Sequence, residues 1–216
     1  MHIPVMLNEC LEALITNPKG IYVDGTLGNG GHAAEVLNRL EVGGTLIGFD
    51  RDVDALERVK DKLKSGEGKR VELVRDNYAN MAERLDQLGI AKVDGLLLDL
   101  GVSSFQLDVA ERGFSFMRDA PIDMRMDQTR GQTAAELVNT ASETELADII
   151  YRYGEDRSSR RIARSIVAAR AKMEIATTGQ LAGIVERAVG GRKGKKTHPA
   201  TKTFQALRMA VNDELA

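Results

Sequence analysis

The sequence predicts an α/β fold built on a mostly parallel sheet and interrupted by a helical insertion. Two patterns carry this prediction. Short apolar runs alternate with longer runs that repeat apolar residues at helical spacing. Three of the short runs end in an acid, at Asp24, Asp50 and Asp99, and a glycine-rich turn follows the first of them. A strand, a tight loop and a helix in that order open a nucleotide-binding sheet.

The first half of the chain is expected to supply this sheet. Its expected elements, in order, are helix 6–16, strand 21–24, helix 33–40, strand 45–50, helix 52–63, strand 71–74, helix 79–88 and strand 93–98. Because strands alternate with helices, right-handed crossovers should make the sheet mostly parallel.

After Asp99 the pattern becomes helical, with expected helices at 133–138, 143–151, 158–171, 178–188 and 200–215. We therefore expect an α/β domain over 1–106, a helical substrate-side domain over 107–199, and a helix over 200–216 that returns to the α/β domain. No strand follows the insertion, which predicts a chain cut short and a sheet without its last strands. The apolar edge at 96–98 would then be open to pair with a second copy.

The glycine loop indicates a ligand site at the start of a helix. Gly28, Gly30 and Gly31 would let the backbone turn sharply and bring bare amides to a ligand. The spacing alone also fits a dinucleotide fingerprint or a plain strand-to-helix turn. The strand-end acids, of which Asp24 is nearest the loop, favour a different ligand, because they would repel a pyrophosphate. They suit S-adenosylmethionine, which carries an ammonium, a sulfonium and ribose hydroxyls, so an NAD-linked dehydrogenase is the weaker alternative.

Charge is distributed unevenly along the chain. The formal net charge is −2, yet residues 151–216 hold 14 Lys and Arg against 6 Asp and Glu. This basic part indicates an anionic partner such as nucleic acid. Its candidate RNA-binding residues, which a solvated surface would explain about as well, are Arg157, Arg160, Arg161, Arg164, Arg192, Lys193, Lys195 and Lys196.

Other classes of protein are disfavoured by what the sequence lacks. It has no long apolar segment and no signal-peptide pattern, so we expect a cytoplasmic protein without a membrane partner. With one cysteine and three scattered histidines, we expect no metal site.

Several motifs together resemble the bacterial small-subunit ribosomal RNA methyltransferases that modify the N4 amine of a cytidine. The matching stretches cover residues 2–9 (HIPVMLNE), 23–32 (VDGTLGNGGH), 99–104 (DLGVSS), 112–116 (RGFSF), 121–127 (PIDMRMD), 153–155 (YGE) and 198–208 (HPATKTFQALR). The resemblance implies a Rossmann-like class I methyltransferase that acts on small-subunit ribosomal RNA or on a ribosomal particle. It implies cofactor contacts at Gly30, Gly31, His32, Asp50, Tyr78, Asp99 and Gln106.

Four of these positions also have an ordinary structural explanation. Asp50 could accept the ribose hydroxyls or cap the following helix. Tyr78 could lie against the adenine or pack on the sheet edge. Asp99 could face the methionine end of the cofactor or the target amine, or be a surface acid. Gln106 could bind the cofactor or a base, or simply be exposed to solvent.

The candidate catalytic residues are Asp99, Asp123 and Arg125. Many amino-methyltransferases have an Asp/Asn-Pro-Pro-Tyr/Phe turn after the fourth strand, whereas this chain has DLGVSS from Asp99 onward. Asp99 as the acceptor for the amine is therefore a hypothesis. Asp123 and Arg125 alternate with methionines, which fits either a wall of the substrate pocket or an ion-paired structural loop. A noncatalytic RNA-binding or assembly factor on the same scaffold is the alternative from another functional class.

Overall fold

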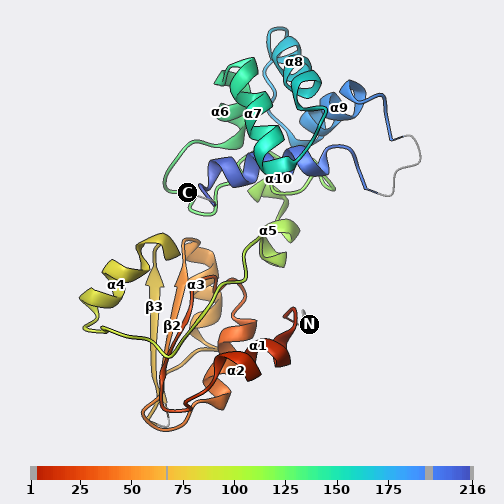
Figure 1. Ribbon diagram of the computed structural model, residues 1–216. Helices are drawn as coiled ribbons and strands as arrows, with labels where there is room; N and C mark the ends of the chain where they lie inside the picture. Colours follow the sequence, from red (N-terminus) through yellow and green to blue (C-terminus); the bar gives the residue numbers. More distant parts are fainter. Residues whose placement is uncertain (1–3, 67, 193–196, 215–216) are drawn as a thin grey trace. The chain divides into compact units, whose positions relative to one another are not determined.

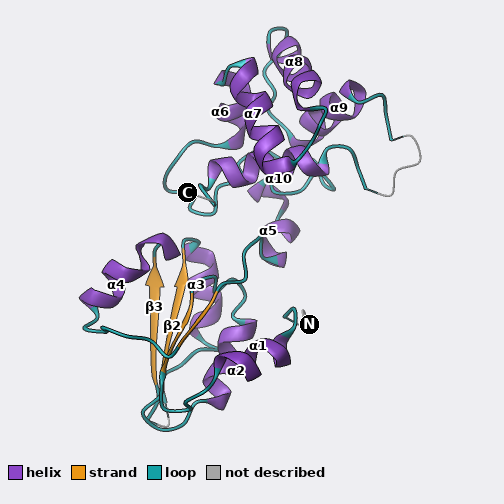
Figure 2. Ribbon diagram, in the orientation of Figure 1, coloured by secondary structure: helices purple, strands orange, loops and turns teal. Residues whose placement is uncertain are grey.

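The computed structural model describes residues 4–66, 68–192 and 197–214. The chain divides into two compact units, Met1–Ser104 and Phe105–Ala216. Figure 2 shows that the strands belong to the first and that the second is built of helices and loops. We call them the sheet unit and the helical unit.

The sheet unit contains a four-stranded sheet made of β1 (Ile21–Asp24), β2 (Thr45–Asp50), β3 (Arg70–Arg75) and β4 (Gly95–Leu97). Its strand order is β3-β2-β1-β4, and every neighbouring pair is parallel. The predicted parallel α/β sheet is confirmed. Because the strands are parallel, the residues that end β1 and β2 lie at one edge of the sheet, the carboxyl edge.

Helices cover both faces of this sheet, and the alternation of side chains along each strand explains how. The helices are α1 (Leu7–Leu14), α2 (Gly31–Arg39), α3 (Val53–Lys60) and α4 (Met81–Gln87), the last preceded by η1 (Tyr78–Asn80). Tyr22 and Leu46 pack with α1, α2 and α3, whereas their neighbours Val23 and Ile47 pack with α4. Figure 1 shows α1 and α2 on one side of the strands and α4 on the other.

The helical unit is built around α7 (Glu143–Gly154), which packs against α8 (Ser159–Arg170) and α10 (Thr201–Val211). α9 (Thr178–Ala188) packs against α8, and α6 (Ala134–Thr140) contacts both α8 and α10. Two short helices, α5 (Ser104–Asp108) and η2 (Ala110–Arg112), lie before the first helix that the sequence predicted in this half of the chain.

The expected return of residues 200–216 to the α/β domain needs correction. These residues belong to the helical unit, and α10 packs against α7 and α6. Phe204 and Leu207 are buried there, so helices cover the apolar side that we expected a sheet to cover. Helical periodicity shows that a face is apolar but does not show what covers it. The boundary between the units also falls after Ser104, two residues before the expected one.

β4 forms one edge of the sheet and, among the described strands, pairs only with β1. Next to this edge, Leu96, Leu98 and Leu100 are 45%, 40% and 58% exposed. Pairing of this edge with a second copy stays a prediction. None of the described helices is long and apolar enough to cross a membrane.

Candidate functional site

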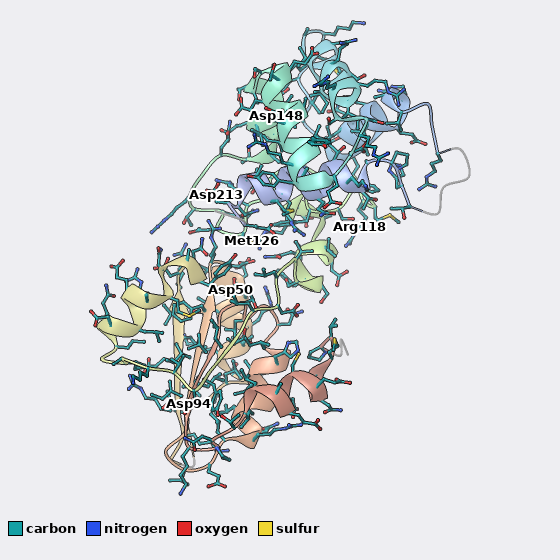
Figure 3. The ribbon with its side chains drawn as sticks, in the orientation of Figure 1. Asp50, Asp94, Arg118, Met126, Asp148 and Asp213 are labelled. Carbon is teal, nitrogen blue, oxygen red and sulfur yellow. The ribbon has the colours of Figure 1, made fainter. Side chains whose placement is uncertain are left out.

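Two acids end neighbouring strands at the carboxyl edge of the sheet. Asp24 is the last residue of β1 and Asp50 the last residue of β2, while Asp99 follows the end of β4 by two residues. Figure 3 shows Asp50 at this edge and Asp94 at the opposite edge, where the Asp94 carboxylate accepts a hydrogen bond from the Ile21 amide. Of the labelled acids in the sheet unit, only Asp50 is therefore placed to meet a ligand at the carboxyl edge.

Asp24 is a buried acid without a cationic partner in ion-pair contact among the described residues. Its side chain is almost fully enclosed, and it accepts a hydrogen bond from the Thr26 amide at 3.0 Å. Burial raises the pKa of Asp24 to about 6. The Thr26 amide and His32 oppose this shift, and Asp50 and Asp99 add to it. The site therefore contains a carboxylate whose charge a cationic ligand would stabilise.

Asp50 holds the glycine loop to β2. One carboxylate oxygen accepts from the Gly28 amide at 2.8 Å and the other from the Asp52 amide at 2.9 Å. Burial raises the pKa of Asp50 even though these amides lower it. Asp52 caps α3 by accepting from the Asp54 amide, so the capping role that we considered for Asp50 belongs to Asp52. A carboxylate has about four acceptor positions, which leaves Asp50 capacity for donors from a ligand.

The three glycines of the loop differ in how closely other atoms pack against them. Gly28 has a left-handed φ of 51°, and a Cβ there would meet only Ser103 at 3.6 Å and the Thr26 carbonyl at 3.8 Å. At Gly30 a Cβ would lie 2.8 Å from Val59, and at Gly31 it would lie 2.5 Å from Pro4. Gly30 and Gly31 thus permit close packing within the protein. Around Gly28 a Cβ would make only ordinary van der Waals contacts, so its backbone is less closely packed against the protein than that of Gly30 or Gly31.

His32 and Asp99 lie next to each other at this edge. His32 is in the first turn of α2, with Nδ1 3.8 Å from the Asp99 carboxylate and Nε2 3.1 Å from the Val5 carbonyl. The Asp99 amide donates to the Thr26 hydroxyl at 2.6 Å. The Asp99 side chain is 56% exposed, so it can reach a substrate, and it also fits the alternative of a surface acid.

Tyr78 and Gln106 lie in different units. Tyr78 begins η1 after β3, and its Cβ is 3.3 Å from where a Cβ of Gly25 would stand, which places it at the carboxyl edge. Gln106 is in α5, within the helical unit, and is buried rather than exposed as the structural alternative required. Contact of either residue with a cofactor stays a prediction.

Asp123 and Arg125 bind each other in the helical unit. The Arg125 guanidinium donates to both Asp123 oxygens, from Nε at 3.0 Å and from Nη2 at 2.9 Å, and both side chains are mostly buried. Burial alone would raise the pKa of Asp123, but its bonds to Arg125 lower it overall. Met124 between them is fully buried with a left-handed φ of 61°. This geometry favours the ion-paired structural loop over the pocket wall.

Three of the predicted RNA-binding arginines, Arg160, Arg161 and Arg164, are exposed on α8. Arg157 precedes the helix, which begins at Ser159, so it does not lie on α8 with the other three. Arg164 lies 3.6 Å from the Glu143 carboxylate. Arg192 is exposed, and the predicted Lys193, Lys195 and Lys196 lie outside the described residues.

Sequence reasoning missed the polar residues that hold the loop in place. Thr26 joins Asp24 to Asp99, and the Asn29 amide donates to the Ser104 hydroxyl at 2.9 Å. Thr26 follows Gly25 and Asn29 stands between Gly28 and Gly30, and this proximity to glycines was the available signal. Among the described residues, no cluster of His, Cys, Asp and Glu could hold a metal ion.

Comparison with known proteins identifies the family. A sequence model of the MraW methylase family matches residues 1–216. A relative from Geotalea uraniireducens is 54% identical over 216 residues, which are 100% of this chain and 69% of the relative. Relatives from Symbiobacterium thermophilum and Syntrophus aciditrophicus are 52% and 53% identical, covering 99% and 100% of this chain and 67% and 68% of their own lengths. All three are named ribosomal RNA small subunit methyltransferase H. The chain belongs to the MraW methylase family, which confirms the resemblance, and it spans about two thirds of the length of these relatives.

Proposed function

We propose that this member of the MraW methylase family transfers a methyl group from S-adenosylmethionine to the N4 amine of a cytidine in small-subunit ribosomal RNA, in the cytoplasm. The names of its relatives support the RNA substrate and the type of reaction. The observation that carries the proposal is the buried Asp24, which lies beside Asp50 and the glycine loop at one edge of a parallel sheet.

The residues at this edge fit the methyl donor. Asp50 would accept the ribose hydroxyls, because it keeps acceptor capacity while its amide bonds hold it still. The charge on Asp24 would be stabilised by the cationic part of the cofactor, and Gly28 would let the ligand approach the backbone. When bound, the cofactor supplies an electrophilic methyl group on a sulfonium.

Asp99 is the residue of the sheet unit best suited to the target amine. The N4 lone pair of cytosine is delocalised into the ring, so the amine is a poor nucleophile and needs orientation and acceptors for its hydrogens. The Asp99 carboxylate is exposed, while its backbone is held by Thr26 and its side chain lies beside His32. Asp99 would accept an amine hydrogen and thereby orient the lone pair.

The first experiment separates the methyl donor from NAD. Calorimetry on the unaltered chain should show binding of S-adenosylmethionine and no measurable binding of NAD, because the strand-end carboxylates repel a pyrophosphate. Binding of NAD alone would identify a dehydrogenase and overturn the proposal.

The second experiment tests the reaction. Labelled methyl groups should pass to small-subunit ribosomal RNA, offered naked or as particles, and nucleoside analysis should find the label in N4-methylcytidine. The Asp99→Asn variant should lose transfer and keep cofactor affinity, whereas Asp86→Asn, at an exposed acid of α4, should change neither. Binding of both cofactor and RNA by the unaltered chain without any transfer would favour the noncatalytic alternative.

A further inference from the structure

An open groove of about 670 Å³ lies between α8 and α9, within the helical unit. Small residues from both helices form much of its lining: Ala168 and Ala169 on α8, and Gly179 and Gly183 on α9. Because these side chains are short or absent, an extended chain can approach the two helix backbones closely. None of the described residues that line the groove has an aromatic ring.

Two basic side chains of the groove make no hydrogen bond or ion pair within the described part of the protein. Lys172 and Arg187 line it, both are exposed, and neither side chain has a hydrogen bond or ion pair with another described residue. Other arginines of the same unit are engaged: Arg112 donates to two backbone carbonyls, and Arg125 and Arg208 pair with acids. Two cations without a partner among the described residues therefore line this groove.

Local geometry directs the Arg187 guanidinium over the groove. A Cβ at Gly183 would lie 3.2 Å from the Arg187 Nη1 atom, so glycine leaves the guanidinium room to lie along α9. Basic residues continue from the groove along α8, where Arg161 and Arg164 stand one turn before the lining residues Ser165 and Ala168. Glu174 is the acid among the described residues of the lining.

We propose that this groove binds the ribose–phosphate backbone of the RNA substrate, with Lys172 and Arg187 each meeting a phosphate. The inference rests on the proposed function, which supplies RNA as the partner. Unpaired cations over a lining of small residues suit a polyanionic chain. Nonspecific binding of single-stranded bases commonly uses aromatic platforms, so the lining favours contact with the backbone rather than with the bases.

The first test measures the salt dependence of binding to a small-subunit ribosomal RNA fragment. Lys172→Ala and Arg187→Ala should each reduce the slope of log K against log salt by about 0.7–0.9, the value for one phosphate contact. The matched control is Arg152→Ala, which removes an exposed arginine of α7 without an ion pair among the described residues. The control should leave the slope unchanged, and equal slopes in all three variants and the unaltered chain would overturn the proposal.

The second test fills the groove without changing its charge. Ala168→Trp should weaken RNA binding by roughly tenfold or more, since losing two phosphate contacts costs about that much. Thr144→Trp places the same ring at an exposed position of α7 and should have no effect.

Full RNA affinity in a folded Ala168→Trp protein would show that RNA binds elsewhere on the basic surface, or that the groove receives a protein. Cofactor affinity, measured in every variant, should not change. Absence of RNA binding by the unaltered chain would instead contradict the proposed function itself.

Discussion

Acids at two places in this chain are both largely enclosed, yet their surroundings differ in kind. At the carboxyl edge of the sheet, Asp24 is buried without a cation in ion-pair contact among the described residues, and its pKa is raised to about 6. In the helical unit, Asp123 is enclosed by Arg125, and its pKa is lowered. A cationic ligand can stabilise the charge of an acid that the protein compensates poorly. An acid that is already fully paired within the protein gives such a ligand little additional binding energy.

Hydrogen bonds from two other residues also hold the backbone of the turn that contains Asp123. Asn212 at the end of α10 accepts from the Met126 amide and donates to the Met124 carbonyl, both at 2.7 Å. The buried Arg112 donates to the carbonyls of Arg125 and Met126. These bonds hold Met124 in its left-handed conformation. We infer that residues 121–127 form a rigid support, and that the carboxyl edge of the sheet is where ligand chemistry occurs.

The largest expected effect tests whether residues 121–127 have the structural role that we infer for them. Arg125→Met should destabilise the helical unit by about 3 kcal/mol, because it leaves the mostly buried Asp123 without its partner. Amide hydrogen exchange over residues 122–138 would measure the loss, and Arg130→Met, at an 85% exposed arginine, is the control. If stability is kept while methyl transfer disappears, the pair is catalytic and the contrast between the two acids is wrong.

The next effect has the opposite sign. The pKa of Asp24 in the folded protein is above its ordinary value of 3.8, so the folded state binds this proton more tightly than the unfolded state. Its contribution to stability is complete below about pH 4 and is lost as the pH rises through about 6. Asp24→Asn should therefore increase the free energy of unfolding at pH 8 by roughly 2–3 kcal/mol, at 1.36 kcal/mol for each pKa unit.

The same variant should bind S-adenosylmethionine more weakly. In the unaltered chain, affinity for the cofactor should rise with pH through about 6 as Asp24 ionises, and in Asp24→Asn this rise should flatten. Urea unfolding and calorimetry at pH 5 and pH 8 would measure both effects. A variant that is less stable at pH 8 and binds the cofactor normally would assign Asp24 to structure.

The sheet could be predicted from sequence because its signals are local. An apolar run that ends in an acid and a glycine turn defines β1 and the loop wherever the rest of the chain lies. The pairing of Asp123 with Arg125 remained one of two alternatives, because a period-2 pattern does not show where side chains point in an irregular turn. The partner of α10 was mispredicted, since it depends on contacts between residues far apart in sequence, such as Asn212 with Met126. Local patterns placed the acids that end β1 and β2 better than they placed the contacts around residues 121–127.

A smaller effect concerns cofactor affinity alone. Asp50→Ala should weaken binding of S-adenosylmethionine by about 1.5–3 kcal/mol, the scale for losing a charged hydrogen-bonding partner. Because Asp50 also holds the Gly28 amide, Asp50→Asn serves as the matched variant that keeps an acceptor for it. Asp50→Asn should bind the cofactor better than Asp50→Ala and less well than the unaltered chain. Equal affinity in all three proteins would remove Asp50 from the site.

The smallest expected effect concerns Glu155, whose backbone in the helical unit is left-handed, and tests whether this residue has a structural or a chemical role. Glu155 ends α7 with a left-handed φ of 49°, its side chain is exposed, and it belongs to the YGE motif at 153–155. Glycine adopts this conformation without strain, so Glu155→Gly should stabilise the helical unit by about 0.5–1 kcal/mol and leave methyl transfer unchanged. Glu155→Gln keeps the backbone strain and removes the charge, and should change neither property. Loss of methyl transfer in both variants would show that the Glu155 carboxylate contacts the substrate, and the helical unit would then contribute an acid to the chemistry as the sheet edge does.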